Sequence, residues 1–303
     1  MVKKYLKKII NKFLNTFLSK KFNGYIKDDL IVLLYHSISN KPSVFHDKHK
    51  LNVTEENFRE QIMFFKKYYN VISPLDLLNG NYKKPAVLFS FDDGIENYFT
   101  NALPIMEEFK VPSIHFLNMA PINGEFFFAG LCEFLYDKKI SNKNSLFSKI
   151  EDVKDYLKDK KLLNDVKKYH GDFVTIDKLK NFENNPLVFF GNHMYNHYNL
   201  TTLNKEEIEL NINLNDLKLK KFKNYLPFFA YPFGVKDICY NNYTDNILIE
   251  KNFKKIFYAD SLSFNSKDGI FLNRKPITND LNTEKNLKNS ILFNKLRNSI
   301  KVT

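Results

Sequence analysis

The sequence is poor in cysteine, lacks tryptophan and contains no long apolar run. Its two cysteines, Cys132 and Cys239, lie far apart and outside any CxxC pair. We therefore predict neither a zinc–thiolate site nor a disulfide framework, which fits a reducing compartment. No stretch of 18 consecutive apolar residues occurs, so no membrane-spanning helix is predicted. Without a Pro/Gly-rich linker or an internal repeat, the 303 residues favour one domain over two.

Phenylalanine, tyrosine and lysine are abundant instead. Hydrophobic residues make up 44% of the chain, and 30 Phe and 17 Tyr supply the aromatic packing. The net charge is +12, and more than half of it comes from residues 1–22, which contain seven lysines and no acidic residue. The remainder is nearly balanced in charge. This distribution argues against a nucleic-acid partner, because the basic residues gather in one segment rather than along a groove.

Residues 1–28 are predicted to form a basic amphipathic segment. The apolar residues of its first part recur at helical spacing: Tyr5, Leu6, Ile9, Ile10, Phe13, Leu14, Phe17 and Leu18. A helix of this kind over residues 3–22 suits an anionic membrane surface, and the alternative is a surface helix that packs on its own domain. No cleavable signal peptide is recognisable. We therefore expect a cytoplasmic protein, with peripheral binding at the inner membrane face as an option.

Predicted strands alternate with predicted helices along most of the remaining chain. This alternation predicts parallel βα units and one βα-barrel-like domain over residues 29–285, followed by a tail at 286–303. An aromatic and then strongly charged stretch at about 121–172 interrupts the pattern as an insertion. Four short motifs fall at predicted strand ends, where chemistry gathers in such barrels: YHS, FDDG, GNHMYNH and AYPFG.

Two of these motifs together predict a metal site. Asp92 and Asp93 are adjacent after an apolar strand, and like charges this close raise the free energy of both ionised forms. His193 and His197 are four residues apart, so that both imidazoles can face one point. A histidine pair alone is often accidental. Two histidines and a carboxylate at neighbouring strand ends form a common ligand set with open positions, which would leave the other aspartate of the pair as a base.

SFDDG at 90–94, HMYNH at 193–197 and AYPFG at 230–234 resemble the polysaccharide deacetylase family, which shares the NodB homology domain and is grouped with carbohydrate esterase family 4. The resemblance covers roughly residues 29–280. It implies a distorted (β/α) barrel and a metal-dependent hydrolase that removes N-acetyl groups from the amino sugars of a bacterial surface polysaccharide or its precursor. The N-acetylated sugar or polysaccharide would be its partner.

The resemblance also implies residue roles. Asp92 would be the general base, and Asp93, His193 and His197 would hold the metal, with zinc as first choice and nickel, cobalt or manganese as alternatives. The backbone N–H of Phe233 would stabilise the oxyanion.

The sequence departs from the family pattern at three points. Met194 stands where Ser or Thr usually follows the first metal histidine, and Ala230 stands where an arginine usually steadies the base. We predict that Arg274 takes over the arginine's task. No histidine follows His197, so His36 in YHS is our candidate general acid, as in a permuted branch resembling poly-N-acetylglucosamine deacetylases. Its alternative is a core histidine.

Other residues carry weaker predictions. Tyr231, Phe126 and Phe127 are candidates for sugar binding, although an aromatic cluster such as FFF at 126–128 is more often core. The remaining histidines are predicted to be structural or exposed: His46, His49, His115 and His170. The departures keep a second function open, a catalytically inactive peripheral membrane module that binds glycans with the same fold.

Overall fold

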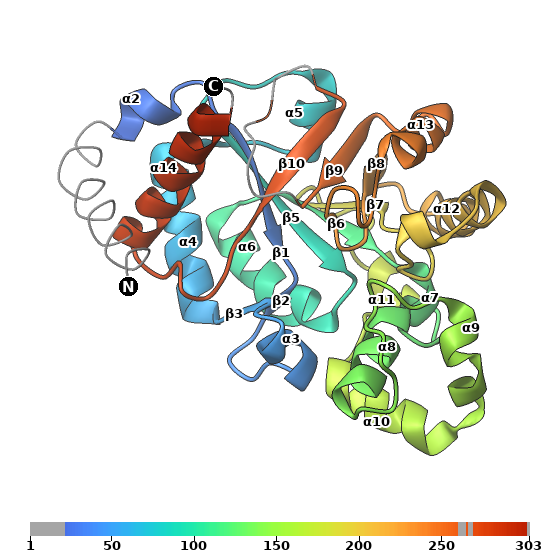
Figure 1. The fold of residues 1–303 in the computed structure, drawn as a ribbon. Helices are drawn as coiled ribbons and strands as arrows, with labels where there is room; N and C mark the ends of the chain where they lie inside the picture. Colours follow the sequence, from blue (N-terminus) through green and yellow to red (C-terminus); the bar gives the residue numbers. More distant parts are fainter. Residues whose placement is uncertain (1–21, 260–264, 266–268, 302–303) are drawn as a thin grey trace.

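The computed structural model describes residues 22–259, 265 and 269–301 (Figure 1). The predicted basic helix over residues 3–22 lies outside this range except for Phe22. That residue begins α2 (Phe22–Ile26), and both Phe22 and Ile26 are buried in the main hydrophobic core. Within the described ranges, no helix combines the length and the apolar character needed to cross a bilayer.

Seven parallel strands form a closed barrel, which confirms the predicted fold class. In barrel order they are β1 (Leu30–Tyr35), β5 (Ala86–Asp93), β6 (Ser113–Leu117), β7 (Val188–Asn192), β8 (Tyr225–Ala230), β9 (Lys255–Tyr258) and β10 (Phe271–Pro276). The barrel closes because β1 pairs with β5 on one side and with β10 on the other. The short β4 (Asn70–Val71) adds to β5, and β2 (Ser37–Ile38) pairs with β3 (Asn52–Val53) in a separate sheet.

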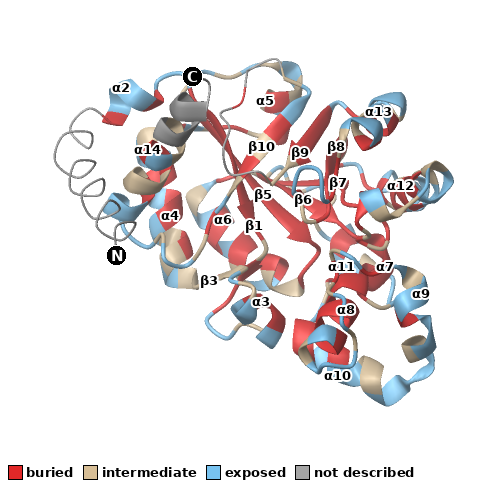
Figure 2. Ribbon diagram, in the orientation of Figure 1, coloured by how far each residue is buried: buried red, intermediate tan, exposed pale blue. Residues whose placement is uncertain are grey.

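The strands are buried on both faces, as their continuous apolar runs predict (Figure 2). Alternate residues of β1 illustrate this. Leu30 and Val32 belong to a cluster with alternate residues of the other strands, which is the barrel interior. Ile31 and Leu33 belong to a second cluster that includes helical side chains, which is the layer between barrel and helices. The period of two thus separates the two cores.

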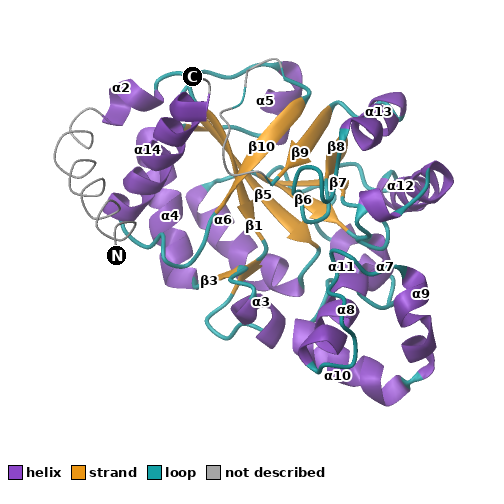
Figure 3. Ribbon diagram, viewed as in Figure 1, coloured by secondary structure: helices purple, strands orange, loops and turns teal. Residues whose placement is uncertain are grey.

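Helices surround the barrel (Figure 3). They are α3 (Val44–Lys48), α4 (Glu55–Tyr68), α5 (Pro74–Asn79), α6 (Leu103–Phe109) after a π-helical turn at Tyr98–Ala102, α11 (Ile176–Lys180), α12 (Lys205–Leu219), α13 (Asn242–Glu250) and α14 (Glu284–Lys301). Thr54 caps α4, because its side chain accepts a hydrogen bond from the N–H of Asn57. The segment that we expected as a C-terminal tail contributes α14, whose Leu287, Ile291 and Leu292 are buried in the main core.

The residues predicted as an insertion form a group of helices beside the barrel mouth, at the lower right of Figure 1. These are α7 (Met119–Ile122), α8 (Phe128–Asp137), α9 (Ile150–Val153), the 3-10 turn Lys154–Lys158 and α10 (Lys160–His170). The last four of these elements enclose a small apolar core of their own around Phe128, Leu131 and Leu135, whereas Met119 and Ile122 of α7 belong to the main core. Phe45 of α3 belongs to the same core, so the insertion packs against the loop that follows the first barrel strand.

Candidate active site and metal centre

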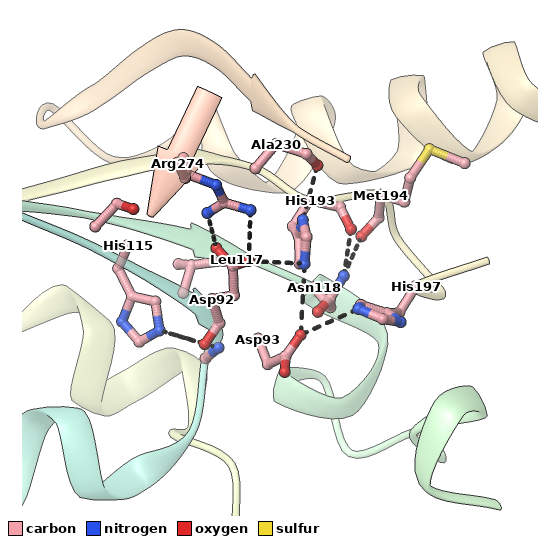
Figure 4. Close-up of polar contacts among 12 residues, drawn as sticks. Asp92, Asp93, His115, Leu117, Asn118, His193, Met194, His197, Ala230 and Arg274 are labelled. Carbon is pink, nitrogen blue, oxygen red and sulfur yellow. Dashed lines mark hydrogen bonds and ion pairs between the residues drawn. The ribbon is translucent and has the colours of Figure 1, made fainter. Parts of the chain in front are cut away.

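The predicted site residues meet at the carboxyl ends of the barrel strands. Asp92 and Asp93 end β5, His193 follows β7, and Arg274 lies in β10 (Figure 4). They line one cavity of about 420 Å³, which also contains His36, His197, Tyr231 and Phe233. The structure therefore brings together residues that are up to 238 positions apart in sequence, as parallel strand ends require.

A change of backbone direction lets both aspartates reach the cavity. Successive side chains of a strand point to opposite faces, but Asp93 and Gly94 have φ values of 75° and 85°. Any side chain at Gly94 would meet Ile122, whose Cδ1 lies 2.6 Å from the expected Cβ position. The His115 Nε2 atom lies 3.1 Å from the Gly94 nitrogen and 3.0 Å from the Asp92 carbonyl oxygen. His115 thus supports the turn from below, in keeping with its predicted structural role.

Asp93, His193 and His197 form a compact ligand set. Their candidate ligand atoms all lie within 4.8 Å of one another. The Asp93 Oδ1 atom is 3.5 Å from the His193 Nε2 atom and 3.3 Å from the His197 Nε2 atom. These spacings are longer than hydrogen bonds to a shared oxygen and leave room for an ion between the three side chains.

Neighbouring groups orient both histidines. The His193 Nδ1 atom lies 2.7 Å from the Ala230 carbonyl oxygen. Because a carbonyl can only accept, Nδ1 carries the proton and Nε2 presents a lone pair toward Asp93. The His197 ring lies between two aromatic rings, with centroid distances of 5.4 Å to Phe127 and 4.7 Å to Phe233.

The three residues fit a divalent cation. The Asp93 Oδ1 atom is buried and has no hydrogen-bond partner among the residues that the structure describes. Burial, and then the charge of Asp92, raise the pKa of Asp93 well above its ordinary value. Burial, and then the neighbouring His193, lower the pKa of His197. A cation would compensate the buried carboxylate and bind the neutral imidazoles, which is what this donor set requires.

Asp92 has a different partner. Arg274 donates two hydrogen bonds to its carboxylate, Nη1 to Oδ1 at 2.6 Å and Nη2 to Oδ2 at 2.8 Å. The guanidinium is 1% exposed and also lies over the Phe116 ring. Burial alone would raise the pKa of Asp92, but the charge and hydrogen bonds of Arg274 hold it well below its ordinary value. In the family pattern an arginine steadies the base, and Ala230 occupies that arginine's position in this chain. Arg274, the predicted substitute, contacts Asp92 instead.

His36 follows β1 and lines the cavity beside these residues. Burial lowers the pKa of His36 to about 4, despite the opposing effect of the Asp92 charge, so its imidazole is neutral at pH 7. Met194, the second departure from the family pattern, points away from the site into an apolar cluster and is fully buried. Its backbone N–H donates to the Asn192 Oδ1 atom at 2.9 Å.

Three buried asparagines that the sequence analysis did not select hold the histidine loop. The Asn118 Nδ2 atom donates to the His193 and Met194 carbonyl oxygens. Asn215 donates to the Leu117 carbonyl oxygen at 2.8 Å and to the Asn192 Oδ1 atom at 2.9 Å, and accepts from the Met119 N–H at 2.9 Å. One signal existed, because Asn215 lies on the buried face of α12 with Ile208, Ile212 and Leu219. A polar residue at a core position of a helix requires partners.

The three predicted sugar-binding aromatics occupy different places. Phe127 is buried and lines the cavity beside His197. Phe126 instead lines a neighbouring cavity of about 330 Å³, to which Phe127 also contributes. Tyr231 is fully buried at the cavity edge, and its hydroxyl donates to the Asp245 carboxylate at 2.8 Å. Of the remaining histidines, His46 and His170 are buried, whereas His49 lines the cavity.

Comparisons with known proteins agree with this geometry. The family model for polysaccharide deacetylase matches residues 79–256, which is more than half of the chain. The fold is similar to that of IcaB from Ammonifex degensii, with a TM-score of 0.60 and 18% identity over 87% of this chain and 97% of that one.

Two further solved structures are similar. The Streptococcus pyogenes deacetylase PplD has a TM-score of 0.57 and 19% identity over 86% of this chain and 96% of its own. A de-N-acetylase from Aggregatibacter actinomycetemcomitans has a TM-score of 0.58 and 16% identity over 87% and 100%. At these identities the structures support the fold alone. No curated protein matches the chain in sequence. By the family match, which confirms the resemblance seen in the motifs, the chain belongs to the polysaccharide deacetylase family of N-deacetylases.

Proposed function

We propose that the protein is a metal-dependent hydrolase that removes N-acetyl groups from the amino sugars of a bacterial surface polysaccharide or its precursor. The observation that carries the proposal is that a buried metal-ligand set and a buried, ionised carboxylate lie side by side at one cavity. Asp93, His193 and His197 form a ligand set, and the adjacent Asp92 is held ionised by Arg274. A divalent cation, most simply zinc, would supply Lewis acidity that polarises an amide carbonyl and acidifies water.

The protein's own residues would move the protons. Asp92 accepts a proton from the attacking water, and Arg274 keeps its carboxylate in the orientation for doing so. The departing amine nitrogen needs a proton. His36 lines the same cavity and is neutral at pH 7, so it can deliver a proton by relaying the one that Asp92 takes from the water. One proton thus leaves water and one reaches the amine, which balances hydrolysis of the amide. The Phe233 backbone N–H would donate to the oxyanion, and Phe127 with Tyr231 would border the sugar.

The inactive glycan-binding alternative rests on the missing arginine and the missing late histidine. Arg274 contacts Asp92 with two hydrogen bonds, and His36 lines the cavity, so both missing groups have candidate substitutes. For this reason we favour the enzyme. Binding of residues 3–22 to an anionic membrane and a cytoplasmic location stay predictions, because residues 1–21 lie outside the described ranges.

Metal content tests the proposal directly. We expect about one zinc, nickel, cobalt or manganese ion per chain in protein purified without a histidine tag, and loss of that ion in Asp93→Ala and His197→Ala. The control is Asp177→Ala, since Asp177 is an exposed carboxylate outside the ligand set. The metal-loaded protein should release acetate from N-acetylglucosamine oligosaccharides. Wild-type protein that takes up no ion from excess zinc would refute the metal-dependent mechanism.

A further inference from the structure

The cavity has a second polar end that the proposed chemistry does not use. Opposite the strand ends, its walls come from the insertion and from the α3 region. Glu133 of α8 and the following Asn144 and Ser145 contribute one wall, and His49, which ends α3, contributes the other. Between the two ends the cavity wall is aromatic and apolar, with Phe45, Phe127, Leu51 and Phe233 among its residues.

Glu133 is nearly buried, and only one of its two carboxylate oxygens accepts hydrogen bonds from the described residues. Its Oε1 atom accepts hydrogen bonds from the Ser145 N–H at 3.0 Å and from the Ser145 hydroxyl at 2.6 Å. The other oxygen, Oε2, lies 3.7 Å from the His49 Nε2 atom, which is beyond hydrogen-bond length. The residue as a whole is 8% exposed. One carboxyl oxygen therefore holds the loop in place while the other remains available to a ligand.

Two further polar atoms beside Glu133 lack partners. The His49 Nε2 atom and the Asn144 Oδ1 atom are buried and make no hydrogen bond with any described residue. Both residues line the same cavity as Glu133. Buried polar atoms are nearly always paired in folded proteins, so a cluster of unpaired ones at a cavity wall points to a ligand.

Docking of the insertion does not require the His49–Glu133 contact. Asp137, one turn after Glu133 in α8, forms an ion pair with Lys48 of α3 and accepts a hydrogen bond from the Tyr169 hydroxyl of α10 at 2.5 Å. The Phe45 ring packs against Tyr169, with 5.9 Å between centroids. These contacts already join the three helices. A purely structural role would thus leave the unpaired oxygen and nitrogen unexplained.

The arrangement matches the chemistry of a sugar ring. Glu133 Oε2 and Asn144 Oδ1 are acceptors, and the imidazole of His49 can donate or accept. Sugar hydroxyls both donate and accept, so they can pair with acceptors such as these and with either form of the imidazole. The aromatic middle of the cavity suits the apolar face of the ring, since small-ligand sites combine apolar walls with a few fixed polar groups.

We propose that Glu133, His49 and Asn144 form a specificity subsite that binds hydroxyl groups of the amino-sugar ring, while its acetamide lies at the Asp93–His193–His197 end. This inference rests on the proposed function, because it assumes that the acetyl group of a sugar is the reacting group. The insertion then has a role in substrate choice, in addition to covering the barrel mouth.

Two probes on the metal-loaded full-length protein separate sugar binding from chemistry. One is a β-1,6-linked N-acetylglucosamine trisaccharide, and the other is 4-nitrophenyl acetate, which carries an acetyl group but no hydroxyl. Glu133→Gln keeps an acceptor for Ser145 while removing the charge, and Asn144→Ala removes the second acceptor. For both variants we expect a KM increase of roughly tenfold or more on the trisaccharide, with similar kcat and unchanged turnover of 4-nitrophenyl acetate. Glu151→Gln, an exposed change in the same insertion, is the matched control.

Two results would overturn the subsite. One is an unchanged KM for the trisaccharide in both variants, and the other is an equal loss on both probes, which would indicate a structural role. Failure of the proposed function looks different, because the wild-type protein would then hydrolyse neither probe. In that case calorimetric binding of the trisaccharide still decides the subsite. Weaker binding by both variants than by wild type supports it, and equal or absent binding refutes it.

Discussion

At the residue scale, two adjacent aspartates have opposite electrostatic surroundings. Burial acts to raise the pKa of both carboxyl groups, but the hydrogen-bonded guanidinium of Arg274 holds the pKa of Asp92 below its ordinary value, whereas the pKa of Asp93 stays raised. Asp93 faces two imidazoles and needs a cation to be stable as a carboxylate. The same residue type can thus serve as an ionised base at one position and as a metal ligand at the next. The difference comes from β10, which supplies Arg274.

Replacing Arg274 tests this division. Arg274→Lys cannot donate two parallel hydrogen bonds to the Asp92 carboxylate, and Arg274→Ala also leaves the buried Asp92 unpaired. We expect kcat for deacetylation to fall about 10²-fold or more in Arg274→Ala, and by less in Arg274→Lys, since positioned general bases contribute on this scale. Initial rates of acetate release at saturating substrate would measure the change.

Metal content and the circular dichroism spectrum are the controls, because Arg274 is outside the ligand set. Both should match those of the wild-type protein. Full kcat in Arg274→Ala would show that Asp92 does not need the guanidinium, and the assignment of Arg274 as the positioning residue would then be wrong.

At the element scale, the histidine loop depends on contacts between helix α12 and the ends of β6 and β7. Asn215 of α12 contacts Leu117 at the end of β6, Asn192 at the end of β7 and Met119 at the start of α7. Met194 and His197 have φ values of 63° and 57°, a conformation that needs external support in residues other than glycine. The asparagine network supplies that support from behind the site.

Asn215→Ala should therefore lower metal affinity, although Asn215 is not itself a member of the ligand set. Leu117, Met119 and Asn192 would each lose a hydrogen-bond partner, at about 1–3 kcal/mol for each group left unpaired. We expect the free energy of unfolding to fall by at least ~2 kcal/mol and metal affinity to fall about 10- to 100-fold, as for other residues that orient ligands. Asn213→Ala on the exposed side of the same helix is the matched control. Equal metal affinity in the two variants would contradict the supporting role.

The sequence predicted the barrel elements and the central site, but not these supports. The strands at Ile31–Leu34 and Val87–Phe91 can be recognised in the sequence by their continuous apolar runs, which arise because both faces of these strands are buried. Asp92, Asp93, His193 and His197 follow such runs and carry recognisable spacing. Asn118 and Asn215 have no local pattern that reveals their partners, because most of these partners lie 75 to 98 residues away in sequence and even the nearest, Asn192, lies 23 residues from Asn215. Such contacts exist only once the strands are in register.

At the scale of the whole molecule, the cavity is shared between the barrel and the insertion. The catalytic end was predictable from motifs, whereas Glu133 comes from a stretch that showed only aromatic and charged character, and His49 was predicted to be structural or exposed. Figure 1 shows α3 and α10 side by side, which brings two buried histidines, His46 and His170, into the junction. The His46 Nδ1 atom forms a hydrogen bond of 2.7 Å with the Ser43 hydroxyl, as donor or as acceptor. Docking of the insertion thus buries two imidazoles that must stay neutral.

This burial predicts a pH-dependent stability. Burial, and then nearby histidines, lower the pKa of His46 to about 3, and burial lowers the pKa of His170 to about 4. The titratable groups that act on His46 are His36, His49 and His170, and those that act on His170 are Asp172 and Lys167. In the unfolded chain both histidines titrate near 6.5, so between pH 6.5 and 4 the unfolded state binds more protons than the folded state. The free energy of unfolding should therefore fall as pH drops below 6.5.

Urea unfolding of the wild-type protein and of His46→Asn at pH 7.5 and pH 5 measures this effect. A single buried histidine with these pKa values loses about 2 kcal/mol of stabilisation between the two pH values. Because the other buried histidines act in the same direction, the wild-type curve alone cannot assign the loss. His46→Asn should lower stability at pH 7.5 but show a fall toward pH 5 that is about 2 kcal/mol smaller than that of the wild type. An identical fall in both proteins would mean that His46 is not kept neutral at the junction, and that the insertion tolerates a charged imidazole there.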